Sequence, residues 1–371
     1  MTELGRELPR IAPDEIRRSG RGGSKAAGEP LVCSHGRGFE RGGETEMNHD
    51  VPGPHMPSGP LHPLAERVAD LFAQNPAWQG LTTRPAAQTR AALDAAAQAL
   101  ALTLEVEPVE HVEELVVSVG DSQIGAKLYR PSTKAPGLVV WVHGGGFVLG
   151  SSDGYDGFSR RLANQSGCAV VSLDYRLAPE HPFPTPVNDV LAATHWLANR
   201  RAAMAGREVP LILAGDSAGG NLAAVVTRKL VEAGNCPLAA QVLVYPCTDD
   251  SDAASLRRFV PPFLNRAEIA WFYDQYDPAR TARNHPDFAP LLASRLAGLP
   301  PALIITAEHD ILTEQAEHYG RRMAAAGVDV RTSRYAGMIH GFATMDVFFD
   351  SVAGQAIAEM STFIGEQLTG R

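Results

Sequence analysis

The sequence feature that most constrains the fold is a short glycine-rich turn between an apolar strand pattern and a helical pattern. The apolar run ends with Leu211–Ala214, the turn reads Gly215-Asp-Ser-Ala-Gly219, and apolar residues then recur at helical spacing over Ser217–Ala233. A Gly-x-Ser-x-Gly sequence in this context is typical of a turn that projects its serine from the end of a strand. Glycines fit there because the strand and the helix approach closely and the backbone is strained. We therefore predict Ser217 as a nucleophile at a helix N-terminus.

Strand and helix patterns alternate along the chain from residue 137 onward. The expected strands are Leu138–Val142, Ala169–Tyr175, Leu211–Ala214, Ala239–Val244, Ala302–Thr306 and Asp329–Arg334. The expected helices are Phe158–Ser166, Val187–Arg201, Ser217–Ala233, Thr313–Ala326 and Met345–Leu368. Several strands are continuous apolar runs, as in parallel strands that are covered on both faces. Two earlier alternating segments, Val112–Val119 and Gln123–Arg130, predict an antiparallel hairpin. The predicted fold class is therefore α/β, with a mostly parallel central sheet, antiparallel first strands and helices on both faces.

Composition changes near residue 60 of the 371 residues. Residues 1–60 are rich in Gly, Pro, Arg and Glu and poor in periodic apolar residues, so we expect a disordered N-terminal extension. Residues 61–371 are expected to form the catalytic domain. Two parts of this domain lie outside the strand–helix alternation: helical patterns over 61–100, and an aromatic-rich helical insert over 248–293.

Charge and hydropathy narrow the class of protein. The net charge is −9 without a concentrated Lys/Arg stripe, which argues against a nucleic-acid partner. No apolar run reaches the ~18 residues that a membrane span needs, and the charged first residues do not resemble a secretory signal. The 4 cysteines, Cys33, Cys168, Cys236 and Cys247, lack metal-ligand spacing. Cys168 and Cys247 lie in or beside expected strands and are expected to be buried free thiols. We expect a cytoplasmic protein with no bound metal and no cofactor.

A serine nucleophile needs a base, and the base needs an orienting acid. His340 lies in a glycine-flanked loop after the last expected strand, where loops converge on the site, and is predicted as the base. Asp310 follows the strand before it and is predicted as the acid, with Glu308 as the second candidate. Asp310 could also cap the next helix, a role compatible with catalysis. His309 and His318 are interpreted as structural, and Asp216 as an anchor for its loop.

The negative charge that develops during acyl transfer needs backbone N–H donors. An apolar strand ends at His143 and is followed by Gly144, Gly145 and Gly146, the position of the oxyanion loop in lipases and esterases. These glycines and Ala218 are the predicted oxyanion hole, and His143 is expected to anchor the loop. A phosphate-binding loop is the weaker alternative, because the Gly-Lys-Ser/Thr ending and the dinucleotide pattern are both absent. In the proline-rich turn that follows the next strand, Arg176 and Glu180 are expected to form an internal ion pair that supports the site.

Four motifs together resemble the hormone-sensitive-lipase family of α/β-hydrolase esterases. They are His143-Gly-Gly-Gly-Phe147, Asp174-Tyr-Arg-Leu-Ala-Pro-Glu180, Gly215-Asp-Ser-Ala-Gly-Gly220 and Ile339-His-Gly-Phe342. The Gly-Asp-Ser-Ala-Gly form is similar to one of the family's bacterial branches. The resemblance implies an α/β-hydrolase fold with Ser217, Asp310 and His340 as catalytic triad, and a helical cap built from 61–100 and 248–293. The residues after Asp310, Ile-Leu-Thr-Glu-Gln, depart from the family's usual Asp-Pro-Leu-x-Asp-Glu.

The expected function is hydrolysis of small-molecule carboxylic esters with short-to-medium acyl groups through an acyl-enzyme. Two alternatives stay open at this point: an amidase or lactonase on the same triad, and a non-catalytic ligand-binding relative. Phe147, Tyr155, Trp271 and Phe272 are candidate pocket residues, with a core role as the alternative for each. The family resemblance is also compatible with a homodimer through the last sheet edge.

Overall fold

The central element of the fold is an eight-stranded sheet with the strand order β1-β2-β4-β3-β5-β6-β7-β8. The computed structural model describes residues 56–101, 103–249 and 261–369, all within the unit formed by residues 52–371. The strands are β1 (His111–Val119), β2 (Ser122–Arg130), β3 (Leu138–Val142), β4 (Ala169–Asp174), β5 (Leu211–Asp216), β6 (Leu238–Val244), β7 (Ala302–His309) and β8 (Val330–Ile339). Strand β2 is antiparallel to both β1 and β4, whereas all pairs from β4 to β8 are parallel. The predicted sheet and its antiparallel start are confirmed.

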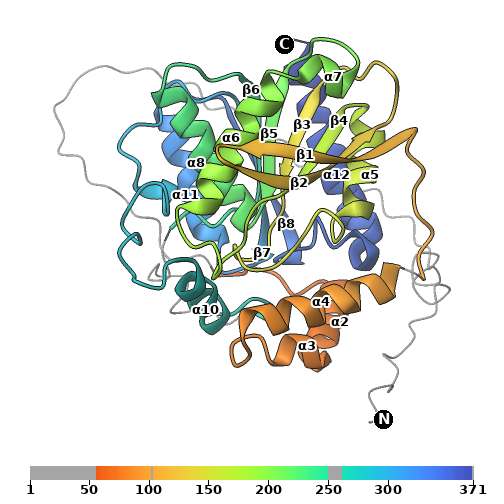
Figure 1. Cartoon of the computed structure of the whole chain (residues 1–371). Helices are drawn as coiled ribbons and strands as arrows, with labels where there is room; N and C mark the ends of the chain where they lie inside the picture. Colours follow the sequence, from red (N-terminus) through yellow and green to blue (C-terminus); the bar gives the residue numbers. More distant parts are fainter. Residues whose placement is uncertain (1–55, 102, 250–260, 370–371) are drawn as a thin grey trace. The chain divides into compact units, whose positions relative to one another are not determined.

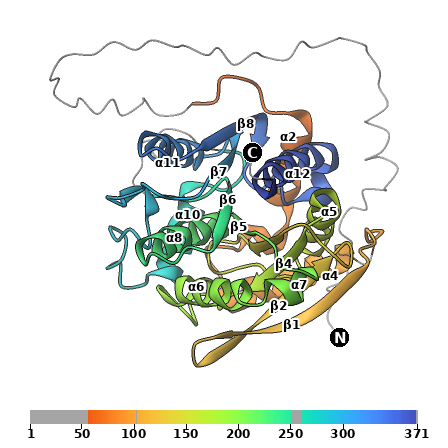
Figure 2. The same cartoon turned by 90° about the horizontal axis from the view of Figure 1, so that it is seen from above.

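Helices cover both faces of the sheet (Figures 1 and 2). On one face lie α6 (Thr185–Ala198), α8 (Ala218–Glu232) and α11 (Thr313–Ala325), and on the other α5 (Asp156–Ser166) and α12 (Asp346–Leu368). The helix predicted over Val187–Arg201 corresponds to α6, which ends three residues earlier, and a short helix, α7 (Arg201–Ala205), follows it. No helix among the described residues is both long and apolar enough to cross a membrane.

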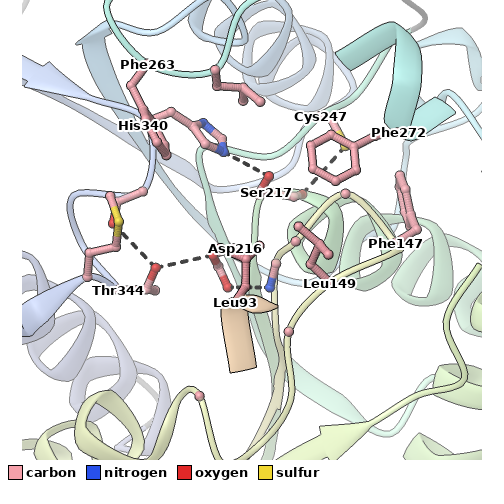
Figure 3. Close-up of a pocket in the computed structure, with 18 of the residues that line it drawn as sticks. Leu93, Phe147, Leu149, Asp216, Ser217, Cys247, Phe263, Phe272, His340 and Thr344 are labelled. Carbon is pink, nitrogen blue, oxygen red and sulfur yellow. Dashed lines mark hydrogen bonds between the residues drawn. The ribbon is translucent and has the colours of Figure 1, made fainter. Parts of the chain in front are cut away.

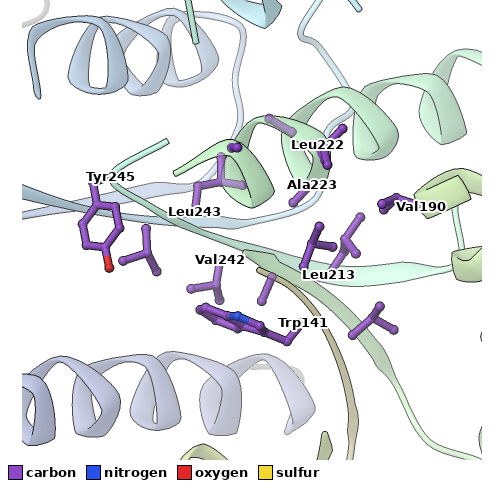
Figure 4. Packing of buried hydrophobic residues seen from close by; sticks show 14 of the residues in the cluster. Trp141, Val190, Leu213, Leu222, Ala223, Val242, Leu243 and Tyr245 are labelled. Carbon is purple, nitrogen blue, oxygen red and sulfur yellow. The ribbon is translucent and has the colours of Figure 1, made fainter. Parts of the chain in front are cut away.

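The core forms where the inner strands meet these helices. Every residue of β3, Leu-Val-Val-Trp-Val, is fully buried, as expected for a parallel strand with both faces covered. Trp141 of β3 and Val242 of β6 lie on one side of the sheet, and Leu213 of β5 faces Ala223 of α8 on the other (Figure 4). This packing holds the carboxyl ends of β3, β5, β7 and β8 close together, which is where the predicted site residues occur.

Four helices gather beside the carboxyl edge of the sheet (Figure 1). Three precede the sheet in the chain: α2 (Pro63–Gln74), α3 (Pro76–Gln79) and α4 (Ala86–Ala101). The fourth, α10 (Arg266–Tyr276), begins with a capping box between Asn265 and Glu268. All four fall within the segments predicted to form the cap, although residues 250–260 of the second segment lie outside the described part.

Strand β8 is longer than predicted. The expected strand ends at Arg334, but β8 continues to Ile339. The added residues include part of the loop that was expected to precede His340. Gly337 in this extension has a φ of +69°, and its N–H donates a 2.8 Å hydrogen bond to Glu308 Oε2 on the neighbouring strand. The extension therefore depends on a glycine conformation and a cross-strand side chain that strand periodicity does not reveal.

Glu308 also binds the segment that leads into α2. Its Oε1 accepts hydrogen bonds from Ser58 N–H (2.9 Å), Ser58 Oγ (2.9 Å) and Gly59 N–H (3.0 Å). The predicted disordered extension lies outside the described residues over 1–55, but residues 56–60 belong to the described part and include these contacts. Residues 58 and 59 therefore contact the fold although they lie before the predicted boundary.

Glu308→Gln should lower stability at neutral pH more than at acid pH. Hydrogen bonds from Gly337 and from Ser58 and Gly59 lower the pKa of the Glu308 carboxyl from its ordinary 4.5 to about 2. A depressed folded-state pKa stabilises the fold above about pH 4.5, and this contribution is lost as the pH falls through about 2. We expect a melting temperature a few degrees below that of the parent protein at pH 7, and a shrinking difference toward pH 3.

Glu366→Gln is the control, because this glutamate forms an ion pair with Arg331 that is about half exposed on both sides. It should change the melting temperature little at either pH. A melting-temperature difference for Glu308→Gln that stays constant from pH 7 to pH 3 would contradict the assignment.

Candidate active site

Ser217 occupies the sharp turn between β5 and α8. Its φ of 53° and ψ of −118° lie outside the regions that L-residues ordinarily adopt. The flanking glycines are required by space: a Cβ on Gly215 would lie 2.6 Å from the carbonyl oxygen of Val142, and one on Gly219 only 1.9 Å from it. The turn is fixed by the Ser217 N–H, which donates to the carbonyl of Val244 at 2.8 Å. The strand–turn–helix context predicted from the sequence is present, with its serine held in a strained conformation.

The three residues predicted as nucleophile, base and acid lie in one hydrogen-bonded chain, and Figure 3 shows its contact between Ser217 and His340. Ser217 Oγ is 2.9 Å from His340 Nε2, and His340 Nδ1 is 2.7 Å from Asp310 Oδ2. All three side chains are buried, with Asp310 only 1% exposed. The other Asp310 oxygen accepts the N–H of Leu312 at 2.9 Å, so this carboxylate binds both the start of the next helical segment and the imidazole.

The second candidate for the acid is engaged elsewhere. Glu308 points its carboxylate at Ser58, Gly59 and Gly337, and no contact between it and His340 occurs within the described residues. The structure therefore favours Asp310 over Glu308 as the partner of His340. Within the described ranges, no group of three His, Cys, Asp or Glu side chains is arranged to hold a metal ion.

His143 anchors the glycine loop after β3. Its Nδ1–H donates to the carbonyl of Gly144 at 2.7 Å, and its ring stacks on Tyr175 at a centroid distance of 4.4 Å. Burial lowers the pKa of His143, which favours a neutral ring. Tyr175 Oη–H completes the contact by donating to the His143 carbonyl at 3.0 Å. The expected anchoring role of His143 agrees with these contacts.

Gly144 departs from the predicted oxyanion hole. Its N–H donates to Asp216 Oδ1 at 2.9 Å and to Tyr155 Oη at 3.1 Å, so this donor is already occupied. The N–H groups of Gly145 and Gly146 have no acceptor in the part of the chain that the structure describes. Ala218 is the first residue of α8, where a helix leaves its N–H unpaired. The available donors are thus Gly145, Gly146 and Ala218.

Gly145→Ala should reduce kcat by about 10²- to 10³-fold, the cost of losing one oxyanion donor. Gly145 has a φ of +107°, and an added Cβ would lie 2.3 Å from the Leu149 carbonyl oxygen, so the loop must move. Steady-state hydrolysis of a p-nitrophenyl ester measures the effect. Gly365→Ala is the matched control, because a Cβ there meets nothing within 4 Å and the residue lies in α12. Equal activity of the two variants would contradict a catalytic role for the loop.

Asp216 joins the three loops of the site. Besides Gly144, its carboxylate accepts hydrogen bonds from Tyr155 Oη (2.9 Å) and Thr344 Oγ1 (3.3 Å), and Thr344 is in turn 2.9 Å from Tyr245 Oη. Burial raises the pKa of Asp216 to about 6, against the opposing effect of Tyr155 and the other donors. The sequence predicts that Asp216 anchors the turn in which it lies. The structure extends this contact to the glycine loop and to the loop that follows His340.

A cavity of about 280 Å³ opens beside Ser217. Phe147, Tyr155 and Phe272 line it as predicted, and in Figure 3 Phe147 and Phe272 lie on the side of Ser217 opposite His340. Trp271 does not line it and instead packs against Phe272 with ring centroids 5.1 Å apart. Successive residues of a helix point in different directions, so α10 can present only one of these two rings to the cavity.

Several lining residues were missed because they come from elements that the sequence places far from the motifs. These are Phe72 of α2, Trp78 of α3, Leu93, Asp94 and Ala97 of α4, and Phe263, Leu264 and Ile269 near α10. Cys247 also reaches the cavity, and burial raises the pKa of its thiol to about 12, so it stays protonated. Cys168, Cys236 and Cys247 are free thiols, whereas Cys33 lies outside the described residues.

The predicted ion pair between Arg176 and Glu180 is wrong. Arg176 binds the buried carboxylate of Asp189 on α6 through its Nε (2.9 Å), its Nη2 and its backbone N–H. Glu180 pairs instead with Arg90 of α4 at 3.0 Å. The proline-rich turn therefore links α6 to α4, and proximity in sequence gave the wrong partner.

The sheet order, the serine turn after β5 and the serine–histidine–aspartate contact together define an α/β hydrolase. Comparison with known families agrees with this class, because residues 139–344 match the family described as alpha/beta hydrolase fold.

Known proteins similar to the chain narrow the class further. It is 38% identical over 245 residues to the esterase LipI of Mycobacterium tuberculosis, an alignment that covers 64% of this chain and 76% of LipI. It is 36% identical over 244 residues to the ethyl acetate hydrolase of Pseudomonas putida, covering 63% of this chain and 76% of that enzyme. The solved structure of a hyperthermophilic esterase from Pyrobaculum calidifontis is similar at a TM-score of 0.75 and 34% identity, over 83% of this chain and 99% of the esterase. The chain belongs to the hormone-sensitive-lipase family of α/β hydrolases.

Proposed function

We propose that Ser217, His340 and Asp310 form the catalytic triad of a carboxylesterase that works through an acyl-enzyme. The observation that carries this proposal is the hydrogen-bonded chain from Ser217 Oγ through His340 to Asp310, with distances of 2.9 and 2.7 Å. Hydrolysis of carboxylic esters is the activity that the family relatives support, among them a carboxylesterase of Mycobacterium tuberculosis.

Acylation begins when Ser217 Oγ attacks the ester carbonyl carbon and its proton passes to His340 Nε2. Asp310 holds the Nδ1–H tautomer, which leaves Nε2 free to accept that proton, and stabilises the imidazolium that forms. The carbonyl oxygen becomes an oxyanion and binds the N–H groups of Gly145, Gly146 and Ala218. Collapse of this intermediate breaks the bond to the alcohol oxygen, which leaves with the proton from His340 Nε2.

Deacylation repeats the same proton transfers with water as nucleophile. His340 Nε2 takes a proton from water, the hydroxide attacks the acyl carbon, and the same N–H groups bind the second oxyanion. The bond to Ser217 Oγ then breaks, His340 returns the proton to this oxygen, and the carboxylic acid is released. The proton that Ser217 loses leaves with the alcohol and is replaced by one from water, so each cycle consumes one water molecule and returns Ser217 and His340 to their starting protonation states.

We further propose that the substrates carry short-to-medium acyl groups and that α2, α3, α4 and α10 act as the cap. The cavity of about 280 Å³ lies just below the usual range for ligand sites, which runs from about 300 to 1,000 Å³. Each of the four helices contributes a residue to its lining. The relative named ethyl acetate hydrolase supports a small ester as the substrate.

A series of p-nitrophenyl esters from acetate to palmitate tests this function. The protein should hydrolyse the acetate, butyrate and octanoate esters and lose activity toward palmitate. An optimum at palmitate would contradict the short-to-medium assignment, and a lack of hydrolysis across the series would contradict the esterase assignment itself. Faster turnover of a matched p-nitroanilide would favour the amidase alternative.

Two further properties belong to this proposal. The free thiols of Cys168, Cys236 and Cys247 support a reducing compartment such as the cytoplasm. Strand β8 ends the sheet with β7 on one side only, which supports a homodimer through that edge. Light scattering on the purified protein would distinguish the dimer from the monomer.

A further inference from the structure

The cavity beside Ser217 contains a carboxylate that ester hydrolysis does not use. Asp94 lies on α4, and its neighbours Leu93 and Ala97 line the same cavity. The triad uses Asp310, and the loop contacts use Asp216. Asp94 is therefore an acidic group in the substrate cavity with no role in the proposed reaction.

Asp94 also lacks a partner. No hydrogen bond or ion pair joins its carboxylate to any residue within 56–101, 103–249 and 261–369. Arg90, one turn earlier on α4, donates instead to the carbonyls of Val148 (2.9 Å) and Ala178 (3.0 Å) and to Glu180 (3.0 Å). Asp153, the other charged group whose field reaches Asp94, is bound by Lys127. The hydrogen bonds of Arg90 are thus directed elsewhere, and only its charge acts on Asp94.

The surroundings of Asp94 make a bound cation favourable. Burial raises the pKa of its carboxyl above the ordinary value, with Arg90 opposing and Asp153 adding to the shift. An ionised carboxylate in a partly buried cavity gains most from a positive partner and repels a second carboxylate. Phe72 and Trp78 line the same cavity, and aromatic faces also attract ammonium groups.

We propose that Asp94 is a specificity-determining residue that selects esters carrying a quaternary or protonated ammonium group and disfavours esters carrying a carboxylate. This proposal rests on the esterase function above. Asp94 does not touch the reacting atoms in this scheme. It contributes binding energy to one part of the substrate and leaves the chemistry at Ser217 unchanged.

Two pairs of esters that differ in charge but not in shape test the proposal. The first pair is acetylcholine and its carbon analogue 3,3-dimethylbutyl acetate, which place the charge on the alcohol side. The second pair is the methyl ester of 4-(trimethylammonio)butanoate and methyl 5,5-dimethylhexanoate, which place it on the acyl side. The measured quantity is the ratio of kcat/KM for the charged ester to that for its neutral analogue.

Asp94→Asn should lower this ratio by about tenfold for at least one pair, since a close charge pair is lost. The ratio is the readout because Asp94 lines the cavity, and an unchanged melting temperature distinguishes a loss of selectivity from damage to the fold. Asp94→Glu keeps the charge and should keep the preference. Asp70→Asn, which removes an exposed carboxylate of α2 outside the cavity, should leave both ratios unchanged.

The outcomes separate this proposal from the one it rests on. If the parent protein fails to hydrolyse even the neutral esters, the esterase function fails. If it hydrolyses them and both ratios are the same in the parent protein and in Asp94→Asn, the esterase function stands and the role of Asp94 is overturned. A fall in the ratio for Asp70→Asn equal to that for Asp94→Asn would also overturn it.

Discussion

Ser217→Ala is expected to reduce the hydrolysis of p-nitrophenyl acetate by about 10⁴- to 10⁶-fold while the protein stays folded. The substitution removes the only atom that the proposed reaction joins to the acyl group. Residual rate above that of water would come from the oxyanion donors and from binding alone. Alanine adds no atom to the tight turn between Gly215 and Gly219, so circular dichroism and the melting temperature should match the parent protein.

Ser361→Ala serves as the control for this variant. Ser361 lies on α12, where its hydroxyl donates to the carbonyl of Ile357 far from the site, and its loss should not alter turnover. Turnover by a folded Ser217→Ala variant at the level of the parent protein would contradict the assignment of the nucleophile.

Asp310→Asn is expected to lower kcat by about 10⁴-fold with little change in the fold. The asparagine can still accept the Leu312 N–H, which Asp310 Oδ1 accepts at 2.9 Å. It no longer stabilises the imidazolium, and its NH₂ group can donate to His340 Nδ1 and so favour the wrong tautomer. Single-turnover kinetics would place the loss in acylation.

Glu308→Gln provides the matched comparison, because Glu308 lies near the end of β7 and Asp310 directly follows this strand. Glu308 binds Ser58, Gly59 and Gly337, so its amide variant should lower the melting temperature at pH 7 and retain most of the activity. If Glu308→Gln loses as much activity as Asp310→Asn, the choice of Asp310 as the acid is contradicted.

The site residues that could be predicted share one property: each directly follows a strand. Ser217 follows β5, Asp310 follows β7 and His340 follows β8, and parallel strands bring their carboxyl ends to one edge of the sheet. The chain order of the strands was therefore enough to place the three side chains at one edge of the sheet, although strand periodicity ended the last strand at Arg334 and not at Ile339. The confirmed fold class rests on the same alternation of strands and helices.

The residues that were misassigned depend on side-chain directions in three dimensions. Gly144 was grouped with the other loop glycines because all three lack side chains, yet only Gly144 faces the carboxylate of Asp216. Glu180 was paired with Arg176, four residues away, although its partner Arg90 is 90 positions distant in the sequence. Neither contact follows from periodicity or from turn composition, because both require the packing of α4 and the glycine loop.

The residues that line the cavity could be predicted from the sequence only in part, for the same reason. Aromatic composition indicated α10 as a source of lining residues, but it did not distinguish Phe272 from Trp271. The Ala-rich pattern of α4 gave no sign that Leu93 and Asp94 would reach the cavity. The contact among Ser217, His340 and Asp310 could thus be predicted from the sequence, whereas the lining of the cavity required the structure.

In the proposed reaction Ser217 carries the acyl group, and covalent labelling can locate the reactive serine without a substitution. The protein is treated with a fluorophosphonate, digested, and the modified peptide is located by mass spectrometry, with remaining activity measured in parallel. We expect one adduct per chain on Ser217, with activity lost in proportion to labelling. Complete loss of activity with the adduct on another residue, or full activity with Ser217 fully labelled, would contradict it.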